Sequence, residues 1–200
     1  MRGERMMKMK RLFKIACLSL LILLTVAIPG CGSKGETADF EMGGKKLSYE
    51  GEKDGEFIHG KGTLYLGSQK VYEGEFVDGL IEGQGTLYVN GKVKYEGQFK
   101  GNLAFGKGII YNSAGKKMFE GTITENDGET YKGTGTLYND QEEPVFQGDI
   151  TVKGDRIEFA NRGKILYSTG AVFYNGELKD GMPSGKGTYY DPEGKILQKN

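Results

Sequence analysis

One motif of alternating residues recurs along the chain with steps of 23 to 28 residues, and it constrains the fold more than any other feature. Tyr72-Glu-Gly-Glu-Phe76 followed by Gly83-Gln-Gly-Thr-Leu-Tyr88 is one copy. Recurrence at this period is typical of repeat arrays, in which each unit buries apolar side chains against its neighbours rather than around a catalytic cleft. The first half of the motif begins at Tyr49, Tyr72, Tyr95, Phe119, Phe146 and Tyr174.

The alternation within the motif predicts strands with one apolar and one polar face. Successive strand residues point to opposite faces, so Tyr72, Gly74 and Phe76 share one face and Glu73 and Glu75 the other. Short segments with Gly or Asn separate the strands, and no helical period is sustained after residue 30. We therefore predict an all-β fold: an elongated, single-layer antiparallel meander of β-hairpin repeats.

Glycine is abundant in these predicted strands, with 34 glycines in 200 residues. A glycine weakens a strand by about 1 kcal/mol, whereas a buried ring contributes up to about 4–6 kcal/mol at 25 cal/mol per Å². We therefore expect aromatic rings to pack over the glycine backbone. A single-layer sheet cannot cover such a face alone, so internal packing and a partner groove both stay open. The candidate binding surface is the aromatic row of Tyr72, Phe76, Tyr95, Phe99, Phe119 and Tyr174.

A second periodic row consists of tyrosines that end the second strand of each unit. By alternation they point outward, which is compatible with stacking on sugar rings and equally with packing across strands. The row consists of Tyr65, Tyr88, Tyr111 and Tyr138.

These copies resemble the MORN repeat (membrane occupation and recognition nexus), which runs Tyr-x-Gly-x-Trp/Phe and then Gly-x-Gly-Thr-Tyr. The resemblance covers residues 49 to about 118 and 174 to 196, whereas the units at Phe119 and Phe146 depart from it. It implies an array that acts as a scaffold. The looser C-terminal half also resembles the repeats of bacterial antitoxin-component proteins, at Tyr174-Asn-Gly-Glu-Leu178.

The first thirty residues have the pattern of a secretory signal. Six basic residues precede the largely apolar stretch 15–28, which is shorter than the span of about 20 residues that crosses a bilayer. The ending Ile28-Pro-Gly-Cys31 resembles the bacterial lipobox, which implies cleavage between Gly30 and Cys31 and lipid on Cys31. We predict a lipoprotein signal peptide at 1–30, a flexible tether at 31–48 and a repeat domain at 49–200.

The composition of the remaining chain argues against several classes of function. After residue 30 it has 21 basic residues (27 minus 6) and 26 acidic ones (27 minus 1), which disfavours nucleic-acid binding. Cys17 leaves with the signal and Cys31 takes the lipid, so no thiol is left for catalysis or metal binding. His59 is the only histidine, which excludes the usual catalytic triads and His-rich metal sites.

Two kinds of acidic cluster have a structural explanation that we prefer to a chemical one. The pairs Glu50 with Glu52 and Glu73 with Glu75 recur because the strand recurs, and glycosidase chemistry is the weaker interpretation. The segments Asn126–Glu129 and Asp191–Gly194 are better explained as turns than as calcium loops. We expect no catalytic site, metal or cofactor.

We therefore expect a non-enzymatic repeat lipoprotein, held on the extracytoplasmic side of a bacterial cell membrane by its lipid. We expect it to act as a scaffold or binding surface for a protein or glycan of the envelope. A toxin-neutralising, immunity-type function is the alternative, suggested by the antitoxin-like C-terminal units.

Overall fold

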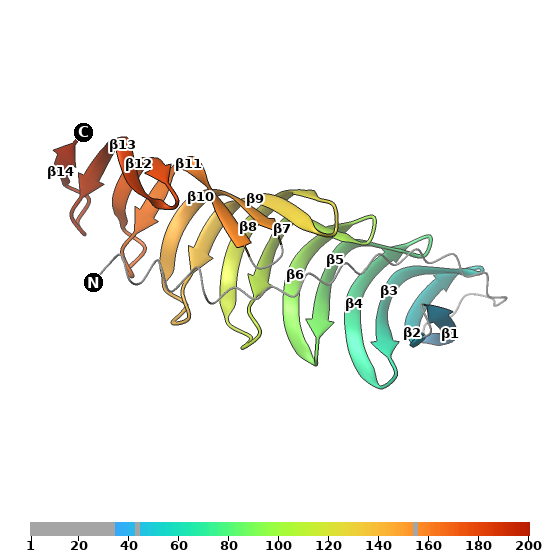
Figure 1. Ribbon diagram of the computed structural model, residues 1–200. Coiled ribbons are helices and arrows are strands. Elements are labelled where there is room, and N and C mark those ends of the chain that lie inside the picture. The colour runs from blue at the N-terminus through green and yellow to red at the C-terminus, as the bar shows by residue number, and fades with distance from the viewer. Residues whose placement is uncertain (1–34, 43–44, 154–155) are drawn as a thin grey trace. The chain divides into compact units, whose positions relative to one another are not determined.

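The computed structural model describes residues 35–42, 45–153 and 156–200, which divide into an N-terminal unit (residues 35–108) and a C-terminal unit (residues 109–200) (Figure 1). In each unit the strands follow one another in the sheet as they do in the chain, and neighbours pair antiparallel. The predicted all-β antiparallel meander of hairpin repeats is confirmed. The strands are β1 (Glu36–Met42), β2 (Lys45–Asp54), β3 (Phe57–Leu66), β4 (Gln69–Val77), β5 (Leu80–Val89), β6 (Lys92–Lys100), β7 (Leu103–Tyr111), β8 (Lys117–Asn126), β9 (Thr130–Tyr138), β10 (Pro144–Lys153), β11 (Arg156–Leu166), β12 (Val172–Lys179), β13 (Met182–Tyr190) and β14 (Ile196–Lys199).

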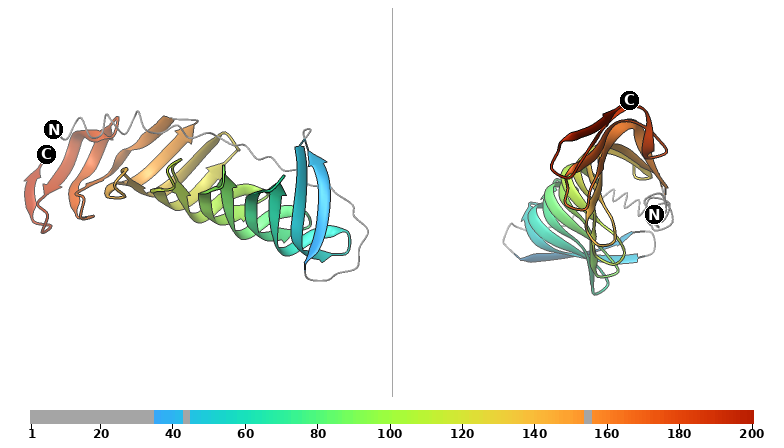
Figure 2. Two further views of the ribbon diagram at one scale, coloured as in Figure 1. Left: turned by 90° about the horizontal axis from the view of Figure 1, so that it is seen from below. Right: turned by 90° about the vertical axis from the view of Figure 1, so that its left-hand side faces the viewer.

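Each copy of the motif forms one hairpin. The aromatic residue that opens each copy lies in the first strand of that hairpin, from β2 for Tyr49 to β12 for Tyr174. The strands are curved along their length, as Figure 2 shows for β2 to β6. Curvature of this kind lets side chains on one face of a sheet approach one another.

A β-bulge after the motif's central glycine contributes to this curvature. Between the pairs Gly74↔Gly85 and Phe76↔Ile81, β4 has one residue, Glu75, whereas β5 has three, so the two extra residues of the bulge lie on β5. The Glu75 carboxylate then lies against Gly83, whose φ of 68° is left-handed. A side chain at Gly83 would be strained and would collide with this carboxylate, so glycine is required there.

The core of the N-terminal unit is a continuous row of perpendicular aromatic rings. Tyr72 contacts Phe76 of its own hairpin and Phe99 of the next one, with ring centroids 5.2 Å apart in both pairs and planes at 86°. Tyr49 with Phe76 and Tyr95 with Phe99 continue the row at 5.3 and 5.1 Å. Edge-to-face packing is a preferred arrangement of aromatic pairs, so each hairpin is joined to the next through its core.

The C-terminal unit keeps the same principle with fewer buried rings. Phe119 lies against Gly121 and Gly135, in the space where their Cβ atoms would be. Leu137 and Ile123 are also buried there. The core of this hairpin is therefore built from a ring over paired glycines together with aliphatic side chains.

The segment 146–172, which lacks the second half of the motif, still forms a hairpin. Strands β10 and β11 pair from Lys153↔Arg156 to Phe146↔Ile165, and Gly163 faces Gly148. The Phe146 ring lies against both glycines and stands 4.9 Å from Phe159 at 81°. In the other hairpins the second glycine of the Gly-x-Gly pair leaves room for the ring. This hairpin lacks that pair, and Gly163 leaves the room instead.

The structure differs from the flexible tether that we predicted for residues 31–48. Strand β1 pairs with β2 in a regular ladder from Glu36↔Gly51 to Met42↔Lys45, and Ala38 and Leu47 are buried. The period-two alternation of Ala38, Phe40 and Met42 is the sequence signal for this strand. We predicted a tether rather than a strand because the segment is mostly polar.

Turns of neighbouring hairpins in the N-terminal unit are joined by hydrogen bonds. The N–H of Gly79 donates to the carbonyl of Ile58 at 2.9 Å, and the N–H of Asn102 donates to the carbonyl of Ile81 at 3.0 Å. The Asn102 Oδ1 in turn accepts the N–H of Ile81 at 2.8 Å. These bonds fix the spacing of successive hairpins at their turn ends.

The predicted signal peptide, the cleavage site and Cys31 lie outside the described residues. Among the residues that the structure does describe, no helix has the length and apolar character needed to cross a membrane.

Candidate interaction surface

The aromatic row predicted as a binding surface is buried. Exposed fractions are between 0 and 6% for its six residues, so they pack inside the repeats and are not available to a partner. Of the two possibilities that the sequence left open, the structure shows internal packing. The six residues are Tyr72, Phe76, Tyr95, Phe99, Phe119 and Tyr174.

The buried tyrosines satisfy their hydroxyl groups within their own hairpins. The Tyr95 hydroxyl donates to the carbonyl of Gln98 at 2.9 Å, and the Tyr72 hydroxyl donates to the carbonyl of Glu75 at 3.2 Å. Burial raises the pKa of Tyr95 to about 12 and raises that of Tyr72 further. These phenols therefore stay protonated at neutral pH and serve the core rather than proton transfer.

The opposite, outward face carries a row of alternating glutamate and threonine side chains. In the N-terminal unit each glutamate faces a threonine on the neighbouring strand, as in Glu73 with Thr63 and Thr86. The glutamates of the row are exposed and the threonines half-buried. This polar row, called the outward row below, consists of Glu50, Thr63, Glu73, Thr86 and Glu96.

A lysine and a tyrosine meet one glutamate of the outward row. The Lys70 ammonium donates to the Glu73 carboxylate at 2.8 Å and lies 5.4 Å from the centre of the Tyr88 ring. The Tyr88 hydroxyl reaches the same carboxylate at 3.4 Å. The hydrogen bond from Lys70 is the main cause that lowers the pKa of Glu73, so this carboxylate is anionic at neutral pH.

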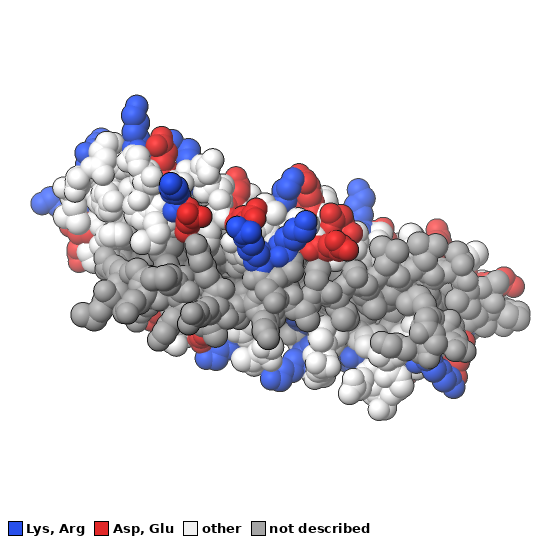
Figure 3. Space-filling model, viewed as in Figure 1, with Lys and Arg blue, Asp and Glu red and all other residues white. Residues whose placement is uncertain are grey.

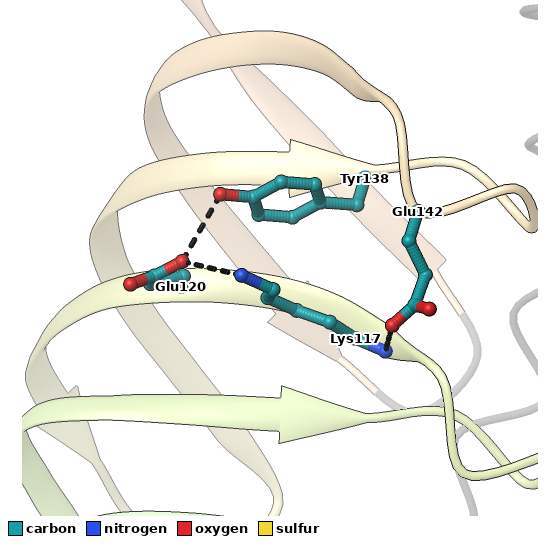
Figure 4. A network of polar contacts seen from close by, with 4 residues as sticks. All are labelled: Lys117, Glu120, Tyr138 and Glu142. Atoms are coloured by element: carbon teal, nitrogen blue, oxygen red, sulfur yellow. Dashed lines mark hydrogen bonds and ion pairs between the residues drawn. The ribbon is translucent and has the colours of Figure 1, made fainter.

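The C-terminal unit repeats this cluster with the same geometry, as Figure 4 shows. Lys117 donates to Glu120 at 2.9 Å and lies 4.7 Å from the Tyr138 ring centre, while the Tyr138 hydroxyl donates to Glu120 at 3.0 Å. The Glu142 carboxylate accepts the backbone N–H of Lys117 at 2.9 Å. Hydrogen bonds from Lys117 and Tyr138 lower the pKa of Glu120.

The outward tyrosines thus pack across strands in at least two repeats. One ring face of Tyr88 and of Tyr138 is taken by a lysine, which is a cation–π contact. Tyr65 and Tyr111 are half-buried at equivalent positions. Sequence reasoning identified the tyrosines but missed Lys70 and Lys117, whose shared position two residues before the core aromatic is the signal that could have found them.

The equivalent row in the C-terminal unit has a different charge. It runs through Thr136, Gln147 and Lys164 to Asn175 and Thr188, so glutamate stands only at its first member, Glu120. On the face seen in Figure 3, Lys and Arg side chains of the described residues lie beside Asp and Glu. The acidic character of the outward row is therefore a property of the N-terminal unit.

The glutamate directly after the motif's central glycine, which is the second member of each acidic pair, has a structural role. Glu52 accepts the backbone N–H of Lys61 at 3.3 Å, and Glu177 accepts that of Lys186 at 3.1 Å. Each of these carboxylates lies over the left-handed glycine that follows the turn, Gly60 and Gly185. They cap the bulge, as the structural interpretation of the acidic pairs requires.

His59 lies at the turn end of the first hairpin, where its Nδ1 is 3.6 Å from the Asp78 carboxylate of the next hairpin. Its equivalent in the following repeat, Glu82, accepts the N–H of Gly101 at 2.9 Å. Glu82 therefore links successive turns by a hydrogen bond, whereas His59 approaches the next turn without one. This position in a repeat agrees with the assignment of His59 to the repeat surface.

The two segments considered for calcium form side-chain-capped turns. The Asp127 Oδ1 accepts the N–H groups of Glu129 and Thr130 at 2.9 and 2.6 Å, and the Asp191 Oδ1 accepts that of Lys195 at 2.7 Å. Within residues 35–42, 45–153 and 156–200, no three His, Cys, Asp or Glu side chains are grouped as metal ligands.

Comparison with known protein families agrees with this geometry. A family model described as MORN repeat matches residues 49–70, 72–93, 95–116 and 174–196. No curated protein matches the chain. The matched segments begin at Tyr49, Tyr72, Tyr95 and Tyr174, whose rings lie over paired glycines in the structure. The four matches and the hairpins that they cover support a MORN-repeat protein.

Proposed function

We propose that this protein is a non-enzymatic, membrane-anchored scaffold of the bacterial cell envelope, which binds a partner through the outward face of its MORN repeats. The main observation behind the proposal is that the aromatic side chains are buried in the core, whereas the outward row presents charged groups at a fixed period. A surface of this kind binds through many similar weak contacts rather than through one pocket.

The glutamates of the outward row support a partner with complementary positive charge. Glu50, Glu73 and Glu96 are exposed and are separated by threonines on the intervening strands. Adjacent strands are about 4.8 Å apart, so the carboxylates recur at about 10 Å. A protein segment or an amino-sugar polymer with cationic groups at that spacing is the partner that fits this charge pattern.

Membrane attachment is supported by the sequence of the first 31 residues. A basic segment, a short apolar stretch and Gly30-Cys31 favour lipidation. The acyl chains supply the affinity, because each buried CH₂ contributes about 0.8 kcal/mol, whereas carboxylates near an anionic surface oppose binding by about 1 kcal/mol each.

Cross-linking in intact cells followed by affinity purification tests the binding role. We expect the wild-type chain to retain a specific envelope partner, and Glu50→Lys combined with Glu73→Lys to lose it. The matched control is Asp54→Lys with Glu56→Lys, which changes the charge equally at an exposed turn. Circular dichroism verifies that all variants fold. Equal recovery of the partner with both double variants would exclude the outward row as the binding surface.

Substitution of Cys31 tests the anchor separately. We expect Cys31→Ala to abolish incorporation of a labelled fatty acid and to prevent cleavage of the signal. Cys17→Ala is the control, because Cys17 lies inside the predicted signal peptide. Unchanged labelling of Cys31→Ala would remove the lipid anchor from the proposal.

A further inference from the structure

The two outermost strands, β1 and β14, are each half of a repeat. In complete repeats a first strand, such as β4, pairs with a second strand, such as β5, in a fixed register. Among the described residues, β1 pairs only with β2 and β14 only with β13. Within the described part of the chain, one edge of each strand therefore has no neighbouring strand and can pair.

Strand β14 has the geometry of a first strand. Its ladder with β13 places Gln198 opposite Tyr189 and Lys199 opposite Thr188. The first strand β6 makes the same ladder with β5, and both ladders skip one residue next to the second strand's final tyrosine. Gln198 and Lys199 thus occupy the positions that Tyr95 and Glu96 occupy in β6.

The connection into β14 also has the form of a connection into a first strand. The N–H of Asp191 donates to the carbonyl of Lys195, and Gly194 donates to Asp191, at 2.9 and 3.0 Å. The turn from Asn112 to Lys116, which leads into β8, has the same two bonds, both at 2.9 Å.

Strand β1 has the geometry of a second strand. Thr37 faces Glu50 and Ala38 faces Tyr49. The same pairs occur one repeat later, where Thr63 faces Glu73 and Leu64 faces Tyr72. Among the strands that the structure describes, the array therefore runs from a second strand, β1, to a first strand, β14.

We propose that β14 of one copy pairs with β1 of a second copy, so that the two half-repeats form one complete repeat and copies associate head to tail. The register of a complete repeat places Gln198 opposite Ala38 and Lys199 opposite Thr37 of the second copy. The apolar pair of the outer strand is exposed until then, with Ile196 and Leu197 at 48 and 62%.

Charge favours this pairing over pairing between two copies of the same edge. Strand β1 contains Glu36, Asp39 and Glu41 and no basic residue, whereas Lys195 and Lys199 flank the apolar pair of β14. In the proposed register Lys199 joins the outward row beside Thr37, whose other neighbour is the exposed Glu50. Two β1 edges or two β14 edges would bring like charges together instead.

Gln198 in place of a core tyrosine makes the contact reversible. Each complete repeat buries a ring between neighbouring hairpins, and the contact between copies lacks that ring. A high local concentration then favours association. The inference is independent of the partner and anchor proposed above, because it concerns only the two edge strands.

A pair of introduced cysteines tests the register in the full chain. Residues directly opposite in an antiparallel ladder have Cα atoms about 4.5–5.5 Å apart, which suits a disulfide. In a chain whose native cysteines are replaced (Cys17→Ser and Cys31→Ser), we expect Thr37→Cys combined with Lys199→Cys to give a ladder of dimers, trimers and larger species after mild oxidation. Each single variant is the matched control and should give no species above a dimer. A double variant that yields only dimers, or no more product than the single variants, would overturn the proposal.

A charge exchange tests the same contact without cysteine. In detergent solution we expect Lys199→Glu to reduce the average mass seen by sedimentation, and the combination of Lys199→Glu with Glu50→Lys to restore it. The exchange of exposed residues leaves the core intact, so circular dichroism should be unchanged. Lys199→Glu alone could reduce the average mass while the combination with Glu50→Lys fails to restore it. Lys199 would then act on another surface, which contradicts the proposed register.

Discussion

The ring of Tyr72 fills the space beside the Cα of Gly85 where any Cβ would lie. The same relationship joins Tyr49 to Gly62 and Tyr174 to Gly187. The tyrosine and the glycine come from the two strands of one hairpin, so the repeat specifies a side chain and the gap that receives it together. This pairing explains why glycine is tolerated in strand interiors despite its low strand preference.

Replacing Gly85 with alanine should therefore destabilise the protein more than an ordinary glycine-to-alanine change. The new methyl group collides with the Tyr72 ring, and overpacking of this kind costs about 1–3 kcal/mol or more. Urea unfolding followed by circular dichroism measures the loss. In a Tyr72→Leu background the same change should cost less, because the ring is gone. Equal costs in both backgrounds would contradict the ring-and-gap pairing.

This relationship also shows how much of the fold the sequence predicts. The alternation of Tyr72, Gly74 and Phe76 predicts the strands, their inward face and the packing of rings on glycine, and the structure has all three. The bulge opposite Glu75 is not predictable from the alternation in β4, because its two extra residues lie on the partner strand β5. Strand β1 was missed because polar residues outnumber its apolar ones.

Loss of a buried hydroxyl is expected to cost less than loss of a ring. Tyr95→Phe removes the hydrogen bond to the carbonyl of Gln98 at 2.9 Å, which is worth about 0.5–1.5 kcal/mol. The urea midpoint should fall by a corresponding amount while the spectrum of the folded state is unchanged. Tyr88→Phe is the control, because its hydroxyl bond to Glu73 is exposed and long at 3.4 Å. A larger effect from Tyr88→Phe would be inconsistent with this ranking.

Alkaline pH should unfold the protein through its core tyrosines. Burial raises the pKa of Tyr49 and of Tyr95 from 10.0 to about 12. The folded state therefore holds these protons more tightly than the unfolded state, which loses them near pH 10. The stabilisation is complete below pH 10 and is lost as the pH rises from 10 to 12. Tyrosinate absorbance and circular dichroism should change together in this window, and early titration of all tyrosines with the fold intact would contradict it.

The candidate site was less predictable than the fold, for a physical reason. Periodicity identifies which residues share a face but not whether that face is covered, and the aromatic row proved to be covered by the next hairpin through contacts such as Tyr72 with Phe99. The outward clusters depend on side-chain length and rotamer, as in the reach of Lys117 to Glu120 and to the Tyr138 ring. Such contacts follow from the register of two strands, which a single sequence leaves open.

Two substitutions of Asn102 should separate the contribution of backbone conformation to stability from that of hydrogen bonding between hairpins. Its φ is 70°, a left-handed value that costs a side-chain residue about 1–2 kcal/mol, and its Oδ1 accepts the N–H of Ile81 at 2.8 Å. Asn102→Gly removes the hydrogen bond while relieving the backbone, whereas Asn102→Ala removes the bond and keeps the strain. We therefore expect Asn102→Ala to be less stable than wild type, and less stable than Asn102→Gly by about 1 kcal/mol in urea unfolding. Equal stability of the two variants would mean that the turn relaxes away from the left-handed conformation. Wild-type stability of Asn102→Ala would mean that the bond to Ile81 adds nothing to the joining of the hairpins.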